Sequence, residues 1–267
     1  MSAQPSDRIV AASVLSEIAD HTARITLNRP DKRNALSLET MLALEAALRE
    51  ASAAPGVRAI VIAGNGPAFS AGHDLAEMVD RDAGFYQELF DECTRLMTLI
   101  HELPHPVIAR VHGIATAAGC QLVASCDLAI ATEQATFATP GVRIGLFCST
   151  PMVAVSRAVG RKRSLQMLLT GQPIDAHTAA DWGLVNAVVT ADRLDEAVAD
   201  LVAAIASASP ITVGIGKRAF YDQVDLNEAG AYELTKAVMA ANAEIADAQE
   251  GICAFLDKRQ PVWTQGG

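Results

Sequence analysis

Aromatic residues are scarce in this sequence: Phe, Trp and Tyr make up only 4% of its 267 residues. Because 51% of the residues are nevertheless hydrophobic, the core has to be built from Ala, Val, Leu and Ile. Such a composition is typical of packed strands and helices and excludes a disordered chain. The length suits one sizeable domain, or one domain with a helical appendage.

Cysteine is also sparse, and the cysteines are scattered. None of the five forms a CxxC pair: Cys93, Cys120, Cys126, Cys148 and Cys253. This odd number excludes a complete disulfide framework and indicates free thiols in a reducing compartment. The six histidines are dispersed, without HExxH or a carboxylate at ligand spacing, and we therefore expect no metal site.

Positive charge is the third shortage, since the net charge is −10. Without a basic stripe to neutralise phosphates, nucleic acid is excluded as a partner. No apolar run reaches the length that spans a bilayer, and the start MSAQPSDRIVAAS has neither a signal-peptide pattern nor an Arg-rich amphipathic stretch. We expect no membrane partner and a cytoplasmic protein.

What the sequence does contain is an alternation of strand and helix patterns. Strands are expected at 22–30 (closed by Pro30), 57–64, 106–113 and 126–132, and helices at 37–51 (capped by Ser37), 81–103 and 117–125. From about residue 190 only helical patterns follow, at 191–208, 210–221, 227–250 and 251–257. This order predicts a loose tail over 1–9, an α/β core over 10–190 and a helical C-terminal region over 191–267.

Common catalytic motifs are missing from the chain. There is no GxSxG, no GxxxxGK[ST] and no GxGxxG after a strand, and "GIGK" at 214–217 lacks the upstream glycine of a P-loop. Two strand-to-helix turns rich in small residues remain, "FSAGHDLAEM" (69–78) and "GIATAAGCQL" (113–122). Small residues let a ligand reach backbone N–H groups at a helix start, and two such turns can form an oxyanion hole. Close packing of helices explains them equally well.

Six stretches in order resemble the crotonases, the enoyl-CoA hydratase/isomerase superfamily. They are "LNRPDKRNALS" (27–37), "FSAGHDLAEM" (69–78), "PVIARVHGIATAAGCQLVASCDLAIAT" (106–132), "ATFATPGVRIGL" (135–146), "LLTGQPIDAHTAADWGLVNAVV" (168–189) and "EGICAFLDKRQPVW" (250–263). The resemblance implies a spiral of ββα units with helical C-terminal regions that assemble trimers or hexamers. It also implies an acyl-CoA thioester as ligand, in which coenzyme A is part of the substrate and no separate cofactor is needed.

The resemblance also implies a set of site residues. The oxyanion donors would be the backbone N–H groups of His73 and Ala118, with Gln121 three residues further on. Further substrate contacts are implied along the first loop, at 140–142 and near the C-terminus: Arg33, Ala35, Asp74, Leu75, Ala76, Gly141, Phe255 and Lys258. Arg33 is the expected phosphate contact, and Ala76 stands where many hydratases have a lysine. Phe255 and Lys258 would reach the CoA of a neighbouring subunit.

Two departures from the hydratase pattern concern the reaction itself. Hydratases of the family hold a water between two glutamates, at the positions that here are Gln121 and Gly141. An amide near neutral pH neither takes nor returns a proton, whereas a carboxylate does both. We therefore expect no efficient enoyl-CoA hydration.

Several roles stay open at this point. His73 is the sharpest replacement for the missing acid–base groups, or it contributes only its backbone. Asp74 is interpreted as a helix N-cap, Cys148 as a packed thiol or a nucleophile, and Arg143 as a solvated side chain or the partner of an acyl carboxylate. Cys120, Cys126, Trp182 and Trp263 are expected in packing roles.

Two classes of function fit these residues, and residual hydratase activity through a water held by Gln121 is a third possibility. The first is a lyase or isomerase of fatty acid metabolism that stabilises a thioester enolate and then decarboxylates, isomerises or hydrolyses its substrate. The second is a non-catalytic acyl-CoA-binding or regulatory subunit.

Overall fold

The computed structural model describes residues 12–264; the expected tail over 1–9 lies outside them. Six strands form the larger sheet, in the order β1 (Val14–Ala19), β2 (Thr22–Leu27), β3 (Ala59–Gly64), β5 (Val107–Val111), β7 (Leu128–Thr132) and β10 (Ala187–Val189). Four short strands form the second sheet, in the order β4 (Ala68–Ser70), β6 (Ile114–Thr116), β8 (Thr136–Ala138) and β9 (Ile174–Asp175).

The larger sheet is mostly parallel, and its central strands are buried on both faces. Only β1 and β2 pair antiparallel; the other pairs are parallel, with Ile60 opposite Val107 and Ala109 opposite Ala129. Unbroken runs such as "AIVIAG" suit strands of this kind. All four expected strands are confirmed with shorter bounds. Strand β2 stops at Leu27, because Pro30 opens the 3₁₀ turn Pro30–Lys32.

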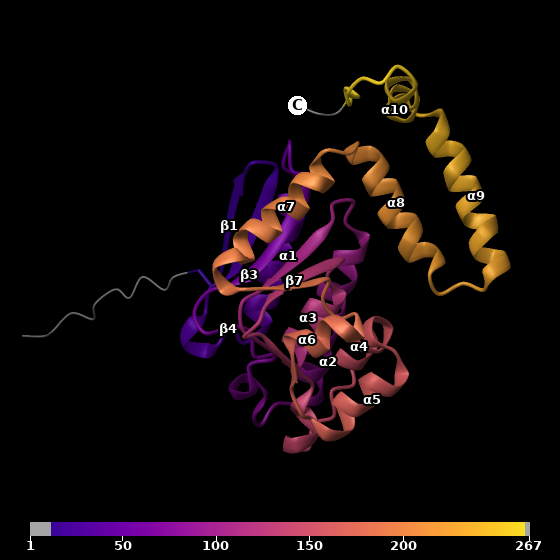
Figure 1. Cartoon of the computed structure of the whole chain (residues 1–267). Helices are drawn as coiled ribbons and strands as arrows, with labels where there is room; N and C mark the ends of the chain where they lie inside the picture. The colour runs from indigo at the N-terminus through magenta and orange to yellow at the C-terminus, as the bar shows by residue number, and fades with distance from the viewer. Residues whose placement is uncertain (1–11, 265–267) are drawn as a thin grey trace, which may run out of the picture.

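Helices cover both faces of the larger sheet (Figure 1). Helix α1 (Leu38–Ala53) is capped by Ser37, whose hydroxyl accepts a hydrogen bond from the N–H of Thr40. It packs on the sheet together with α2 (Ala83–Glu102) and α3 (Ala118–Ser125). On the other face α7 (Leu194–Ala206) crosses the strands and buries Val198 and Val202 against Val61. Each face thus has its own apolar cluster.

Three helices that the sequence patterns did not predict lie beside the second sheet: α4 (Pro151–Val159), α5 (Arg161–Thr170) and α6 (Ala176–Trp182) (Figure 1). Two of them end at a glycine in the left-handed conformation, Gly171 after α5 and Gly183 after α6. Helix α6 contacts β8 and β9, while α4 packs on α3 and on α5.

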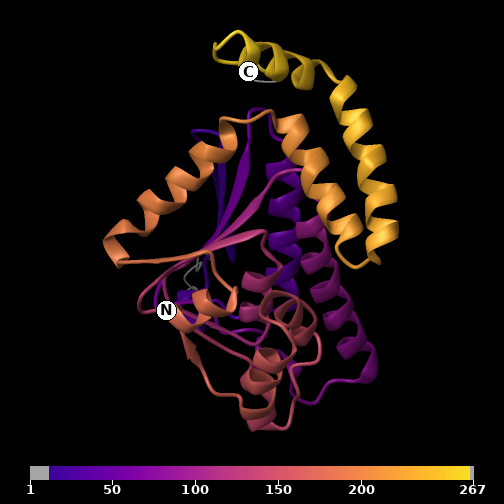
Figure 2. The same cartoon turned by 45° about the vertical axis from the view of Figure 1, so that its right-hand side comes forward.

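The last three helices form an arm that extends from the core (Figures 1 and 2): α8 (Pro210–Gln223), α9 (Glu228–Glu244) and α10 (Ala246–Leu256). The expected continuous helix over 227–250 is wrong. Ile245 has an extended backbone (φ −73°, ψ 152°), which separates α9 from α10. Neither α8 nor α9 has a buried residue.

Lys217 attaches this arm to the core. Its ammonium donates to the carbonyls of Ile100 and His105 and pairs with Asp127 at 2.6 Å (Nζ–Oδ2). Tyr221 of the same helix donates to the other oxygen of Asp127 at 2.8 Å. Lys217, the lysine of the "GIGK" stretch at 214–217, is therefore a structural anchor.

Within residues 12–264, no single helix has the length and apolar character needed to cross a bilayer. Segments 191–206 and 210–223 meet those criteria only as a pair, and the pair is bent by 102°.

Candidate functional site

The first of the two small-residue turns is held by a single parallel bridge between Leu36 and His73. The N–H of Leu36 donates to the carbonyl of Gly72 (2.7 Å), and the N–H of Asp74 donates to the carbonyl of Leu36 (3.2 Å). In such a bridge the peptide groups flanking the central residue make the bonds, so the N–H of His73 itself faces the opposite side. No residue of the described chain accepts a bond from it.

The second turn has an unusual backbone at Ala117, with φ 51° and ψ −119°. A side-chain-bearing residue in such a region costs about 1–3 kcal/mol and is found where the surrounding structure enforces it. The N–H of Ala117 donates to the carbonyl of Ala138 (2.9 Å). The next residue, Ala118, opens helix α3, whose first N–H groups have no partner within the helix. The N–H of Ala118 makes no bond to any described residue.

The two turns approach each other too closely for larger residues. A Cβ added to Gly72, whose φ is +86°, would lie 2.8 Å from Cβ of Ala117 and 3.1 Å from the backbone nitrogen of Ala118. A Cβ added to Gly119 would lie 2.3 Å from the carbonyl oxygen of Ser70. The small residues of these turns are therefore needed for close packing, and they also leave the backbone donors accessible. Both interpretations of the turns are compatible.

A cavity of about 540 Å³ opens beside these turns, a volume suited to a small-molecule ligand. His73, Ala117 and Ala118 form one wall, and Leu75 and Phe90 continue it. The opposite wall is the segment from 3₁₀ helix η3 (Pro140–Ile144) to the start of α4: Pro140, Gly141, Arg143, Ile144, Leu146, Phe147, Cys148, Ser149, Thr150 and Pro151. No Asp or Glu of the described chain lines the cavity.

His73 is the titratable side chain on the donor wall. Neither ring nitrogen makes a hydrogen bond of normal geometry within residues 12–264, and the ring meets Phe90 edge to face at 5.6 Å between centroids. Burial lowers the pKa of His73, and the nearby carbonyl of Leu36 only partly opposes this. The imidazole is therefore neutral near neutral pH.

Gln121 lies behind the donor wall. Its side chain is 4% exposed and is absent from the cavity lining. The thiol of Cys93 donates to its Oε1 at 3.7 Å, and burial raises the pKa of Cys93 to about 12, so the thiol keeps its proton. The amide is thus held against α2.

Gly141 has no room for a side chain. An added Cβ would lie 1.9 Å from the carbonyl oxygen of Leu146 and 2.9 Å from Sγ of Cys148. The backbone of the opposite wall therefore fills the space beside Gly141. Burial raises the pKa of Cys148, which favours the packed-thiol interpretation. Cys120 is fully buried and Cys126 is 8% exposed, and burial raises the pKa of Cys120 to about 12.

Asp74 and Arg143 each have a partner within the chain, and Arg143 is also exposed and lines the cavity. Asp74 stands at the N-cap position of 3₁₀ helix η2 (Leu75–Met78), but its carboxylate makes no capping bond and pairs with Arg29 instead. Arg143 donates through Nε to the carbonyl of Thr170 at the end of α5 (3.2 Å). Arg29 was not singled out from the sequence, although it lies in the "LNRPDKRNALS" stretch.

The remaining predicted contacts lie outside the cavity. Arg33 has a left-handed backbone (φ 50°), Ala35 is buried with its carbonyl bound to Arg29, and Ala76 is exposed. Phe255 (82% exposed) and Lys258 lie at the end of α10 and do not line this chain's own cavity. Their roles stay predictions.

The two tryptophans do pack as expected. Trp182 lies against the apolar core, with the guanidinium of Arg163 5.6 Å from its ring centroid. Trp263 donates to the carbonyl of Ser207 at 2.9 Å and lies over Gly251.

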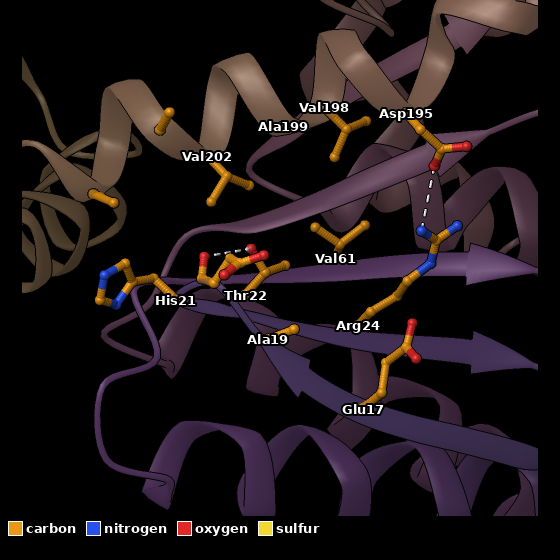
Figure 3. A pocket seen from close by; sticks show the side chains of 13 residues that line it. Glu17, Ala19, His21, Thr22, Arg24, Val61, Asp195, Val198, Ala199 and Val202 are labelled. Atoms are coloured by element: carbon orange, nitrogen blue, oxygen red, sulfur yellow. Dashed lines mark hydrogen bonds and ion pairs between the residues drawn. The ribbon is translucent and has the colours of Figure 1, made fainter.

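A second cavity, of about 430 Å³, lies between the first strands and α7 (Figure 3). Val61, Val198 and Val202 make its floor apolar, while Arg24 points to Asp195 at its rim (Nη1–Oδ1 3.2 Å). None of the predicted site residues lines it. The cavity between the two turns and the 140–151 wall is therefore the candidate site.

This fold and these two turns define a crotonase-type protein. The family model "Enoyl-CoA hydratase/isomerase" matches residues 17–266, and the chain belongs to that family. The predicted fold class is thereby confirmed.

Particular relatives narrow the likeness further. Enoyl-CoA hydratase domain-containing protein 3, mitochondrial, of Xenopus laevis is 48% identical over 242 residues, covering 90% of this chain and 82% of that protein. The crystal structure of the human protein of the same name superposes with a TM-score of 0.92 at 45% identity, covering 94% of this chain and all (100%) of that one. A structure titled enoyl-CoA hydratase from Mycobacterium smegmatis gives 0.92 at 46% identity, covering 95% and 99%.

The expectation of a cytoplasmic location is wrong in the light of these names. The vertebrate relatives, from zebrafish to human, are named as mitochondrial proteins. Location is read from targeting segments rather than from the folded domain, so composition and thiol content of the domain carry no information about it.

Proposed function

We propose that the protein binds acyl-CoA thioesters with the thioester oxygen between the N–H groups of His73 and Ala118. One observation carries this proposal: two backbone donors from different turns adjoin one cavity, and both lack acceptors in the described chain. Donors aimed at a developing oxyanion contribute about 3–4 kcal/mol each to catalysis. The ligand so held is a thioester that forms an enolate.

Efficient hydration of enoyl-CoA does not belong to this proposal. Adding water across the double bond requires one group to take a proton from water and one to give a proton to Cα. Gln121 does neither, Gly141 has no side chain, and the described cavity lining contains no carboxylate. Decarboxylation is favoured, because loss of CO₂ leaves its electron pair in the enolate without a base, and Cα then takes one proton. Isomerisation and thioester hydrolysis each need a base to remove a proton, for which the neutral His73 is the candidate.

Calorimetry tests the binding mode. The probe is an acyl-CoA analogue in which methylene replaces the thioester sulfur, titrated into wild type and Ala118→Val. We expect the bulkier residue to weaken binding at least tenfold while costing about 1–3 kcal/mol of stability through overpacking.

Ala179→Val is the matched control, since Ala179 is equally buried in α6 and lies outside the cavity lining. It should cost similar stability and leave binding intact. Equal affinity of wild type and Ala118→Val would refute the proposal.

The second candidate, a non-catalytic acyl-CoA-binding subunit, is favoured by the same absence of carboxylates. A mass-spectrometric screen of acyl-CoAs decides between the two. Turnover of any thioester that is lost in His73→Ala establishes the enzyme; binding without turnover across the panel establishes the binder.

We also propose that the chain assembles as a trimer or a pair of trimers through the C-terminal arm. Phe255, Leu256 and Val262 are each more than 70% exposed at its end. Because Phe255 and Lys258 lie outside this chain's cavity, a role in CoA binding requires the site of a neighbouring subunit. Sedimentation showing only monomer at micromolar concentration would refute the assembly.

A further inference from the structure

The guanidinium of Arg29 joins the two loops that meet at the first turn. Its Nη1 donates to the carbonyl of Ala35 and its Nη2 to Oδ2 of Asp74, each at 2.9 Å. The side chains of Arg29 and Asp74 are only 24% and 14% exposed. Both bonds are therefore partly shielded from water, where charged hydrogen bonds are stronger than on the surface.

These two acceptors flank the bridge that orients the His73 N–H. Ala35 immediately precedes Leu36, and Asp74 immediately follows His73, while Leu36 and His73 form the bridge itself. The bridge is an isolated one; beyond it the same two segments share a bond from the N–H of Ala71 to the carbonyl of Arg33 (2.9 Å) and one from the hydroxyl of Ser70 to the carbonyl of Asn34 (2.9 Å). The Arg29 side chain adds bonds at Ala35 and Asp74, the two residues next to the bridge, and so joins the two segments where the His73 N–H is oriented.

The backbone of Arg29, the base from which its side chain extends, is itself held by hydrogen bonds. Its N–H donates to Oδ1 of Asn34, and its carbonyl accepts from the N–H of Asn34, each at 2.9 Å. Asn34 is fully buried, and its amide nitrogen donates to the carbonyls of Asn65 (2.9 Å) and Ala68 (2.8 Å). The base of Arg29 is therefore tied to the segment that leads into β4.

We propose that Arg29 is a positioning residue that holds the His73 N–H in line with the ligand carbonyl through its bonds to Ala35 and Asp74. This inference rests on the proposed function. Arginine is required because its planar fork reaches two acceptors at fixed geometry, whereas a lysine ammonium is a single point charge. Misplacement of a catalytic donor by about 1 Å costs up to about 10²-fold in rate.

The test reads the ligand carbonyl directly. Hexanoyl-CoA labelled with ¹³C at the thioester carbonyl is bound to each variant, and the carbonyl stretch is measured by isotope-edited infrared spectroscopy. In wild type the stretch should fall below that of the free ligand, because two N–H donors polarise the bond. Asp74→Asn and Arg29→Lys should lose part of this shift, and Arg29→Met most of it, with affinity weakened about tenfold.

A double variant separates positioning from mere stability. Arg29→Met leaves the Asp74 carboxylate without its partner and is expected to destabilise the fold. Arg29→Met with Asp74→Asn removes that charge, so stability should largely recover, but the carbonyl shift should not. Arg193→Met, which breaks an exposed ion pair with Glu196, should change neither.

The outcomes distinguish this inference from the proposed function. No shift in wild type would overturn the oxyanion proposal itself. A full shift with unchanged affinity in the double variant would overturn the role of Arg29 and leave the oxyanion proposal standing. Should Arg29→Met fail to fold, the nearly isosteric Asp74→Asn decides: a full shift there overturns the positioning role.

Discussion

The core and the C-terminal arm differ in where their polar groups find hydrogen-bond partners and in whether their apolar side chains are buried. Around the first turn, Arg29, Asn34 and Asp74 are buried or half-buried, and their bonds all run to other parts of the core. In the arm, Asp247 and Glu250 also collect several bonds, but from within the arm and the segment after it: Ser209 and Thr264 donate to Asp247, and Arg259 and Val262 donate to Glu250. The arm's apolar side chains remain exposed, Phe255 most of all.

The difference shows where each region finds its stability. Core helices are held by an apolar face against a sheet, whereas α8 and α9 have no buried residue. Helix α8 is attached to the core by Lys217 and by Tyr221, which bonds Asp127 and stacks on His101 at 4.0 Å between ring centroids, and α9 packs on α8. A 17-residue helix with no buried face gains little from propensity alone. The exposed faces of the arm are therefore the surface on which the proposed assembly depends.

The largest effect is expected at the anchor between the two regions. Lys217→Met leaves the Asp127 carboxylate, 14% exposed, without its cation. Breaking a buried pair in this way costs about 3–5 kcal/mol, which urea unfolding at neutral pH will measure. Arg193→Met, the exposed control, should cost less than about 1 kcal/mol. Equal costs would remove Lys217 from its anchoring role.

A smaller loss is expected where the core lines the cavity. Gly141→Ala forces a Cβ against the carbonyl of Leu146, and overpacking of this kind costs about 1–3 kcal/mol. For the same reason Gln121→Glu combined with Gly141→Glu should distort the wall and yield no efficient crotonyl-CoA hydratase, which a spectrophotometric assay checks. A gain in hydration would show that the wall adapts.

Acidification should weaken the core through its buried histidines, and the burial that raises the pKa of Glu92 opposes this only in part. Burial lowers the pKa of four histidines below the usual value near 6.5: His73, His101, His105 and His112. Below that value the unfolded chain binds protons that the folded chain refuses, so the free energy of unfolding falls as pH falls from 7 to 5.

Replacement of one histidine sharpens this test. His105→Gln should flatten the dependence of the urea midpoint on pH. Ser52→Ala removes the hydroxyl that bonds Nδ1 of His105 at 3.1 Å and should lower stability without flattening the slope. A midpoint independent of pH between 7 and 5 in wild type would contradict the prediction.

The smallest change in subunit stability is expected in the arm. Phe255→Ser alters an exposed side chain, so unfolding of the isolated chain should shift by no more than about 0.5 kcal/mol. Its effect should appear instead in sedimentation, as loss of the assembled species. An unchanged sedimentation profile would show that Phe255 takes no part in assembly.

The elements predicted from the sequence were those with a strong local pattern. The β-branched runs of β3, β5 and β7 and the capped, periodic face of α1 each carry enough information within ten to twenty residues. The strands of the second sheet have two or three residues each, too few to show a period. The break at Ile245 follows a helical pattern without any glycine or proline to mark it.

The candidate site likewise has parts that could be predicted from the sequence and parts that could not. Its two turns were predictable because a cluster of Gly and Ala residues is visible in a short window of sequence. The contact between Arg29 and Asp74 spans 45 residues, and the carbonyl of Leu146 that fills the space beside Gly141 belongs to the backbone. Features made by long-range contacts or by backbone atoms leave no local pattern to read.

Gly72 and Ala117 also limit how this sequence can change over generations. Since the methyl group of Ala117 lies where a side chain on Gly72 would go, neither position drifts independently of the other. The effect of a substitution at one position depends on the residue present at the other, which is epistasis arising from close contact between the two turns. Lineages that keep both turns should therefore accept new residues on the far wall of the cavity long before they accept any at this pair.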